Sequence, residues 1–266
     1  MMSAMWTMWL ATAVIFAGFA SFGYFVWGPP GGVAPVDRRG GSVLLPKSVI
    51  DFSYWAIEPV VRGARFLGIR PNHVTFASVG VAFVAAWALA QQAWWLGLLL
   101  FGLASAADML DGYLARRLDL DSGQAGAFLD SFADRVTDSL FLGGIALSGA
   151  SPAATWLAVW ALVASLLISY ARARGEGLGV DCKVGLMQRP ERLAWLSLTL
   201  VAVGFGSVFG SPSTPAIILN VGLAILAILA TVTAIRRALW VIDALSEETR
   251  DETAAVPEGH PHEVEQ

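Results

Sequence analysis

Long apolar segments separated by short polar ones form the dominant pattern along this chain. Each segment is close to the ~20 residues that a helix needs to cross ~30 Å of hydrocarbon. We identify seven of them, at roughly 5–27, 72–90, 93–116, 126–149, 153–174, 191–209 and 214–240. The pattern therefore predicts an all-α, polytopic membrane protein, built as a bundle of helices that cross the bilayer.

The first apolar segment, 5–27, has the position of a signal peptide but lacks its other features. No basic residue precedes it, its apolar run is long, and no clear Ala-x-Ala cleavage site follows it. We therefore predict that residues 1–46 form an N-terminal transmembrane anchor and a linker, 28–46, that is rich in Gly and Pro.

The rest of the chain divides into three parts. Residues 47–70 mix apolar and charged side chains, which favours an amphipathic helix in the membrane interface, bent at Pro59, over a plain connecting loop. The six later apolar segments form one membrane domain over 71–240. Residues 241–266 are acidic and are expected to form a disordered cytoplasmic tail.

Composition agrees with a membrane protein and excludes some functions. Of the 266 residues, 56% are hydrophobic and only 14% are charged, whereas soluble domains usually carry about 25% charged residues. The single cysteine, Cys182, excludes an internal disulfide and argues against a cluster of thiolate metal ligands. With a net charge of −4 and no basic tract, the chain gives no sign of a nucleic-acid partner.

Positive charge falls on one side of the predicted bundle. All 17 Lys and Arg lie in or beside the connections after the first, third, fifth and seventh segments, and the opposite loops, around Gln91, Gly149 and Ser211, carry none. Because cytoplasmic loops carry the excess of Lys and Arg, this side faces the cytoplasm. We expect an integral protein of the inner (cytoplasmic) membrane with its N-terminus outside.

The strongest chemical signal is DMLDGYLARRLDLDSGQAGAFLDSFADRVTD, residues 108–138, where one span ends and the next begins. Asp108 and Asp111 are three residues apart, and Asp130 and Asp134 are four apart, so on helices each pair shares one face. The two spans are consecutive and form an antiparallel hairpin. The two pairs of aspartates can therefore face each other near the cytoplasmic side.

Four carboxylates at the membrane need positive charge to compensate them. One carboxylate at the bilayer centre already costs ~2.5–3.5 kcal/mol. Oxygen ligands select hard cations such as Mg²⁺, Mn²⁺ or Ca²⁺ over zinc, and four carboxylates from two helices suit a two-metal site that clamps phosphate oxygens. The alternative is a set of salt bridges with Arg116, Arg117 and Arg135, which four acids at these spacings disfavour.

These residues resemble the signature of the CDP-alcohol phosphotransferase family, D-x-x-D-G-x-x-A-R followed by G-x-x-x-D-x-x-x-D. Here the first half runs from Asp108 to Arg116 and the second from Gly126 to Asp134. Nine residues separate the two halves, one more than the family's usual eight. The pattern is long and chemically specific, so a chance match is disfavoured.

The resemblance covers roughly residues 50–240, and PNHVT at 71–75 also resembles the family's usual entry to its first helix. Family members have six spans. The resemblance therefore implies a six-helix family core, to which this chain adds one N-terminal transmembrane helix and the interfacial helix. Family members also tend to be homodimers, so a homodimer is expected here.

The resemblance also implies the chemistry. A phosphatidyl group moves from a CDP-linked lipid, CDP-diacylglycerol, to an alcohol, and CMP is released. By this resemblance Asp108, Asp111, Asp130 and Asp134 hold two Mg²⁺ or Mn²⁺ ions, and Asp134 takes the proton from the attacking hydroxyl as the catalytic base. The CDP moiety would lie against the segment that contains Asp111, Gly112, Ala115 and Arg116.

A second polar stretch, ISYARARGEGLGVDCKVGLMQRPERL at 168–193, concentrates basic residues on the cytoplasmic side. By charge alone it is either ordinary cytoplasmic charge or an anion pocket, because arginine forks match phosphate geometry. The sequence of this stretch, together with the Asp134-Arg135-x-x-Asp138 pattern, resembles that of the branch of phosphatidylinositol-phosphate and archaetidylinositol-phosphate synthases. By that resemblance the acceptor is an inositol phosphate. Its phosphate would bind Arg174 and Arg189, with Arg135, Arg172 and Arg192 as further candidates.

Two alternatives stay open from the sequence. The same chemistry could use another acceptor, such as glycerol 3-phosphate or free inositol. A protein of another class, a transporter or a cation channel, could also line its path with acidic residues. No second polar set continues from the aspartates to the opposite side of the membrane, and this favours the enzyme.

Overall fold

The computed structural model describes residues 47–117, 123–182 and 184–255, together with isolated residues between 6 and 21. Within these ranges the regular structure is helical and contains no strand. The helices are α2 (Lys47–Phe66), α3 (Pro71–Ala90), α4 (Trp94–Arg117), α5 (Gly123–Leu147), α6 (Pro152–Glu176), α7 (Arg189–Phe209) and α8 (Thr214–Ala255). The predicted all-α architecture is confirmed.

Five of these helices are long and apolar enough to cross a membrane. They are α3, α4 as far as Gly112, α6, α7, and α8 as far as Glu247. The predicted span 126–149 forms α5, a helix of 25 residues, but it is not among these five because it carries four charged residues, Asp130, Asp134, Arg135 and Asp138. Most of the predicted anchor, 5–27, and the whole linker, 28–46, lie outside the described residues.

Proline at the first turn starts three of the helices. Pro71 and Pro152 are the first residues of α3 and α6, and Pro190 is the second residue of α7. Proline suits these positions because the first amide groups of a helix have no partner within it. At α6 the hydroxyl of Ser151 also accepts a hydrogen bond from the Ala154 amide at 3.0 Å, which caps the helix.

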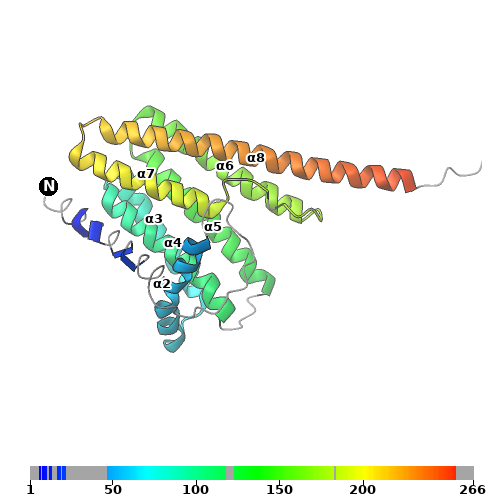
Figure 1. The fold of residues 1–266 in the computed structure, drawn as a ribbon, viewed down its shortest axis with the longest axis horizontal. Coiled ribbons are helices and arrows are strands. Elements are labelled where there is room, and N and C mark those ends of the chain that lie inside the picture. Colours follow the sequence, from blue (N-terminus) through cyan, green and yellow to red (C-terminus); the bar gives the residue numbers. More distant parts are fainter. Residues whose placement is uncertain are drawn as a thin grey trace, which may run out of the picture.

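The helices pack so that a polar site lies at one end and an apolar core at the other. In Figure 1 α8 runs beside α6 and α7. Further contacts join α3 to α4 and to α5, and α4 to α7. The large buried apolar cluster is drawn from 82–104, 141–161 and 196–227, with Met187. These are mostly the helix halves remote from 108–138.

Close backbone approach holds α3 against α5. A side-chain carbon added to Gly144 would lie 2.5 Å from the carbonyl oxygen of Ala86 and 2.7 Å from its Cα. Only glycine fits there, as is typical of helix packing in lipid, where small residues allow close contact. Because α3 also packs against α4, its contact with α5 holds α4 and α5 in place relative to one another. α4 and α5 themselves make few direct contacts.

The structure differs from the sequence prediction at the C-terminal end. α8 continues to Ala255 and projects beyond the other helices in Figure 1, so residues 241–255 are helical rather than disordered. The stretch is rich in Ala and Glu, which are strong helix formers, and the next proline is Pro257. At the other end, α2 occupies most of the predicted helix 47–70, and its place in the membrane interface stays a prediction.

Candidate active site

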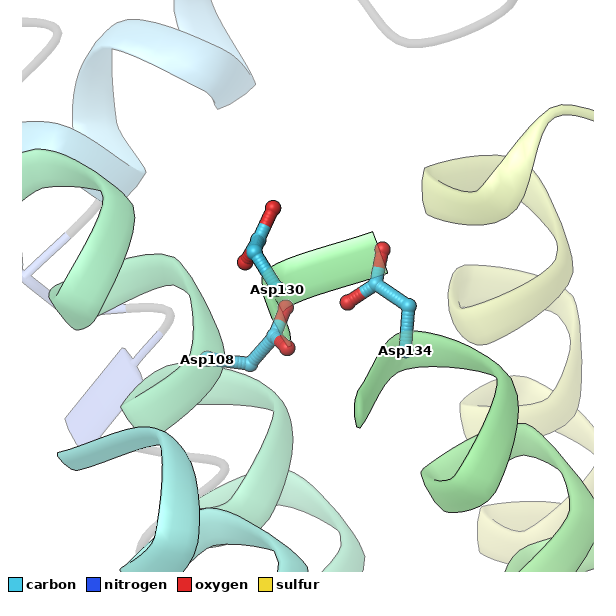
Figure 2. A group of neighbouring side chains, drawn as sticks. All are labelled: Asp108, Asp130 and Asp134. Carbon is cyan, nitrogen blue, oxygen red and sulfur yellow. The ribbon is translucent and has the colours of Figure 1, made fainter. Parts of the chain in front are cut away.

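Three of the four predicted metal ligands lie together. Asp108 on α4, with Asp130 and Asp134 on α5, each offer one carboxylate oxygen, and these oxygens all lie within 4.8 Å of one another. Figure 2 shows the three side chains turned toward one shared space between the helices. The helix periodicities therefore bring the acids together as the sequence suggests.

The group is suited to a divalent cation. All its donors are carboxylate oxygens, which hard cations such as Mg²⁺ and Mn²⁺ prefer. Among the described residues, Asp108 Oδ1 is buried and has no hydrogen-bond partner. Buried oxygens of this kind normally have a partner, and a bound cation would supply one.

Asp111 lies outside this group of three. It is buried, with 3% of its surface exposed, and its Oδ2 accepts a hydrogen bond from the Thr75 hydroxyl of α3 at 2.5 Å. The sequence did not single out Thr75 by itself, although it belongs to the PNHVT stretch at 71–75. The role of Asp111 as a ligand stays a prediction.

Arg189, the first residue of α7, lies directly on the aspartates. Its Nη1 forms ion pairs with Asp108 Oδ2 and with Asp134 Oδ1, the latter at 2.8 Å. Its Nη2 donates to Thr137 Oγ1 at 3.0 Å, and its Nε lies 3.5 Å from Asp138 Oδ1. The guanidinium thus contributes positive charge to two of the three carboxylates that a cation would use.

Asp138 and Arg192 form a buried ion pair behind Arg189. Arg192 Nη2 donates to Asp138 Oδ2 at 2.8 Å, and its Nη1 donates to the Met187 carbonyl at 3.2 Å. Both side chains are less than a tenth exposed. The sequence interpretation gave Asp138 no role, although it continues the four-residue spacing of Asp130 and Asp134.

A cavity of about 750 Å³ opens beside the aspartates, among α5, α6 and α7, with one side chain from α8. Asp130 and Asp134 line it, so the acidic group and the cavity are continuous. The arginines that line it are Arg135, Arg172, Arg189, Arg192 and Arg237. The cavity therefore combines a possible cation site with a strongly basic wall.

Arg174, one of the two foremost candidates for the acceptor phosphate, is not among these lining residues. It is exposed on α6, two residues after Arg172. Because successive residues turn by about 100° on a helix, the two side chains leave α6 in nearly opposite directions, and only Arg172 reaches the cavity. Arg237 of α8, which the sequence interpretation did not select, lines the cavity instead.

The predicted CDP-binding residues lie on the last turns of α4. Asp111 and Gly112 are within its described part, and the side chains of Ala115 and Arg116 lie outside it. Their assignment to the CDP moiety therefore stays a prediction.

Comparison with known proteins agrees with the fold and with the acidic group. Residues 69–243 match the model of the CDP-alcohol phosphatidyltransferase family. The phosphatidylinositol phosphate synthase of Streptomyces avermitilis is 34% identical over 78% of this chain and 89% of its own length. The archaetidylinositol phosphate synthase of Methanothermobacter thermautotrophicus is 34% identical over 52% of this chain and 67% of its own.

Solved structures of one relative are also similar. The crystal structure of Mycobacterium tuberculosis phosphatidylinositol phosphate synthase with CDP-DAG bound has a TM-score of 0.61 and 27% identity, and it covers 69% of this chain and 92% of that chain. The same enzyme in complex with manganese and citrate has a TM-score of 0.61 and 28% identity, with 69% and 87% covered.

This chain belongs to the CDP-alcohol phosphatidyltransferase family. It is an integral membrane enzyme of phospholipid synthesis, which decides against the transporter and the channel. The resemblance drawn from the aspartate signature is confirmed, and so is the likeness to the branch that uses inositol phosphates.

The hydrogen bond between Thr75 and Asp111 gives a prediction for this enzyme. Thr75→Val keeps the shape of the side chain but removes the donor, and a hydrogen bond to a charged group contributes ~1.5–3 kcal/mol. CMP release by the purified protein should fall by about tenfold, which corresponds to ~1.4 kcal/mol. Thr75→Ser, which keeps the hydroxyl, is the control. Full activity in the valine variant would show that Asp111 does not depend on this bond.

Proposed function

We propose that the protein transfers the phosphatidyl group of CDP-diacylglycerol to a hydroxyl of an inositol phosphate and releases CMP. The observation that carries this proposal is the continuity of the acidic group with a cavity walled by arginines. The names of two relatives, both phosphatidylinositol phosphate synthases, support the same acceptor.

Asp134 has the position that a general base needs. It belongs to the acidic group and also lines the cavity, so a hydroxyl of an acceptor in the cavity would lie beside it. The hydroxyl oxygen attacks the phosphatidyl phosphorus and forms a P–O bond, while Asp134 takes the hydroxyl proton. The P–O bond to CMP breaks, and CMP leaves with the electron pair.

We propose that Asp108, Asp111, Asp130 and Asp134 hold two divalent ions, Mg²⁺ or Mn²⁺. When bound, these ions supply the positive charge that stabilises the pyrophosphate and the departing CMP. The arginines that line the cavity, Arg135, Arg172, Arg189 and Arg192, would bind the acceptor phosphate. Arginine forks suit this task because they pair with phosphate oxygens in a bidentate way.

The distribution of charge supports a site that opens to the cytoplasm. The aspartates lie at the ends of the helices where the Lys and Arg residues collect, which is the cytoplasmic side by the positive-inside rule. We therefore propose an enzyme of the inner membrane with its N-terminus outside. A homodimer is proposed from the family resemblance alone.

The test is CMP release by the purified full-length protein, with CDP-diacylglycerol and Mn²⁺ or Mg²⁺. Inositol 1-phosphate, inositol and glycerol 3-phosphate are offered one at a time. CMP release with inositol 1-phosphate alone is the expected result. Release with glycerol 3-phosphate or inositol instead would keep the role of the aspartates and overturn the choice of acceptor. Release with none of the three would count against this reaction.

A further inference from the structure

Asp138, which lies outside the family signature, contacts Arg189. On the basis of the proposed function, we propose that Asp138 is a positioning residue. It would hold Arg189 in the cavity, ready for the acceptor phosphate, once Asp108 and Asp134 ligate a divalent cation.

Arg189 and a divalent cation would share two of the same carboxylates. Arg189 Nη1 pairs with Asp108 Oδ2 and with Asp134 Oδ1, and both aspartates belong to the group whose oxygens lie within 4.8 Å. A cation held by these carboxylates would lie close to Nη1, and the two positive charges would repel each other. Each therefore weakens the binding of the other by the same factor, and we expect cation binding to displace Nη1.

A displaced Arg189 needs another anion, because its side chain is only 19% exposed and an unpaired charge is costly to bury. Asp138 is the nearest candidate. Its Oδ1 lies 3.5 Å from Arg189 Nε, and in the described part of the chain neither atom has a hydrogen-bond partner. A small movement of Arg189 away from the other aspartates would turn this ion pair into a hydrogen bond and satisfy two buried polar atoms.

Asp138 is itself held firmly enough to act as a fixed anchor. Its other oxygen, Oδ2, accepts from Arg192 Nη2 at 2.8 Å, and Arg192 is tied to the Met187 carbonyl through Nη1. Asp138 lies one helical turn after Asp134 on α5, so the carboxylate sits beside the metal-binding group without belonging to it. Anchored through Nε, Arg189 would keep its two terminal nitrogens for the phosphate in the cavity that it lines.

The proposal predicts an order of events. A cation binds first, Arg189 moves onto Asp138, and only then is the acceptor pocket complete. Arg189 therefore couples the two halves of the site, and the strength of the coupling depends on Asp138.

The test begins with Mn²⁺ affinity, measured by electron paramagnetic resonance of the unbound ion on the full-length protein without substrates. Arg189→Gln removes the competitor, so it should bind Mn²⁺ about fivefold more tightly than the unmodified protein, within the range of ordinary coupling energies. Asp138→Asn removes the anchor and should weaken Mn²⁺ binding by about threefold. Asp243→Asn, which removes one negative charge from an exposed position of α8, is the control and should leave Mn²⁺ affinity unchanged.

The double variant separates positioning from a general effect of charge. If Asp138 acts through Arg189, Asp138→Asn should have almost no effect on Mn²⁺ affinity in the Arg189→Gln background. An undiminished effect there would overturn the proposal, as would Arg189→Gln binding Mn²⁺ no more tightly. If Asp138→Asn does not fold, Asp138→Glu keeps the charge and moves the carboxylate. It should then reproduce the loss of Mn²⁺ affinity only when Arg189 is present.

Kinetics give a second readout. Asp138→Asn should raise the KM for inositol 1-phosphate by about tenfold, while kcat and the KM for CDP-diacylglycerol change by less than about threefold. A merely structural role would change all three together and would count against the proposal. If inositol 1-phosphate proves to be the wrong acceptor, the Mn²⁺ results still stand, so the failure of the proposed function and the failure of this inference can be told apart.

Discussion

Asp134→Asn is expected to abolish CMP release, with a loss of about 10³-fold or more. Removal of a general base alone typically costs 10²–10⁴-fold, and this residue also contributes an oxygen to the acidic group. The substitution keeps the size of the side chain and removes its charge and its basicity. CDP-diacylglycerol binding should largely survive, because Asp108 and Asp130 remain.

The measurement is a time course of CMP release with inositol 1-phosphate at saturating substrates, together with the binding of CDP-diacylglycerol. Asp243→Asn, at an exposed position of α8, is the matched control and should keep full activity. Activity of Asp134→Asn within about tenfold of the unmodified protein would rule out its assignment as base. If a higher concentration of Mn²⁺ restored the activity, Asp134 would be a ligand only.

The aspartate group could be predicted because local periodicity determines most of it. Residues three and four apart share a helix face, so the pairs Asp108/Asp111 and Asp130/Asp134 were visible in the sequence. The same spacing, continued by one turn, would have indicated Asp138. Helix periodicity does not predict how far α4 and α5 lie apart, and Asp111 turns to Thr75 of α3 rather than to the group of three.

The basic wall of the cavity could be predicted only in part, since it depends on the relative placement of distant helices. The resemblance ranked Arg174 ahead of Arg172, but which of the two lines the cavity depends on which face of α6 meets α5. The contact of Arg189 with Asp108 joins residues 81 positions apart. No local pattern encodes such a distance, although the family resemblance did select Arg189.

Arg237 illustrates the same limit in the apolar part of the chain. Arg236 and Arg237 follow a long apolar span, where a pair of arginines normally marks the cytoplasmic boundary. In the structure the two differ, because Arg236 is exposed and Arg237 is only 4% exposed. Arg237 Nε donates to the Val184 carbonyl at 2.8 Å and its Nη1 to the Ile168 carbonyl at 3.0 Å. It therefore ties α8 both to α6 and to the segment that leads into Arg189.

Arg237→Met should destabilise the protein by about 2–4 kcal/mol. The half-buried Val184 carbonyl loses its donor, at ~1–3 kcal/mol, and the Ile168 carbonyl, which lies inside α6, loses a second hydrogen bond, at ~1 kcal/mol. Arg236→Met, one residue earlier on the same helix, loses the same charge and should stay within ~0.5 kcal/mol of the unmodified protein. The difference between the two variants isolates the hydrogen bonds from the charge.

The reactivity of Cys182 can report this difference in stability. It is the single cysteine of the chain, it is fully buried, and its Sγ lies 4.0 Å from the Arg237 carbonyl. Burial raises the pKa of the Cys182 thiol above its usual value, so the thiol stays protonated at neutral pH. Since the thiolate is the reactive form, a maleimide dye should label the folded protein slowly and the unfolded protein fast.

Labelling of Cys182 during a thermal ramp in detergent should therefore show an earlier transition for Arg237→Met, lower by about 5–10 °C, and an unchanged one for Arg236→Met. Labelling that begins well below this transition would mean that the segment around Cys182 opens locally while the bundle stays folded. In that case Arg237 would hold the wall of the cavity rather than the whole fold, and the KM for the acceptor should rise with little change in global stability. Identical transitions in both variants would show that the two hydrogen bonds contribute nothing to either.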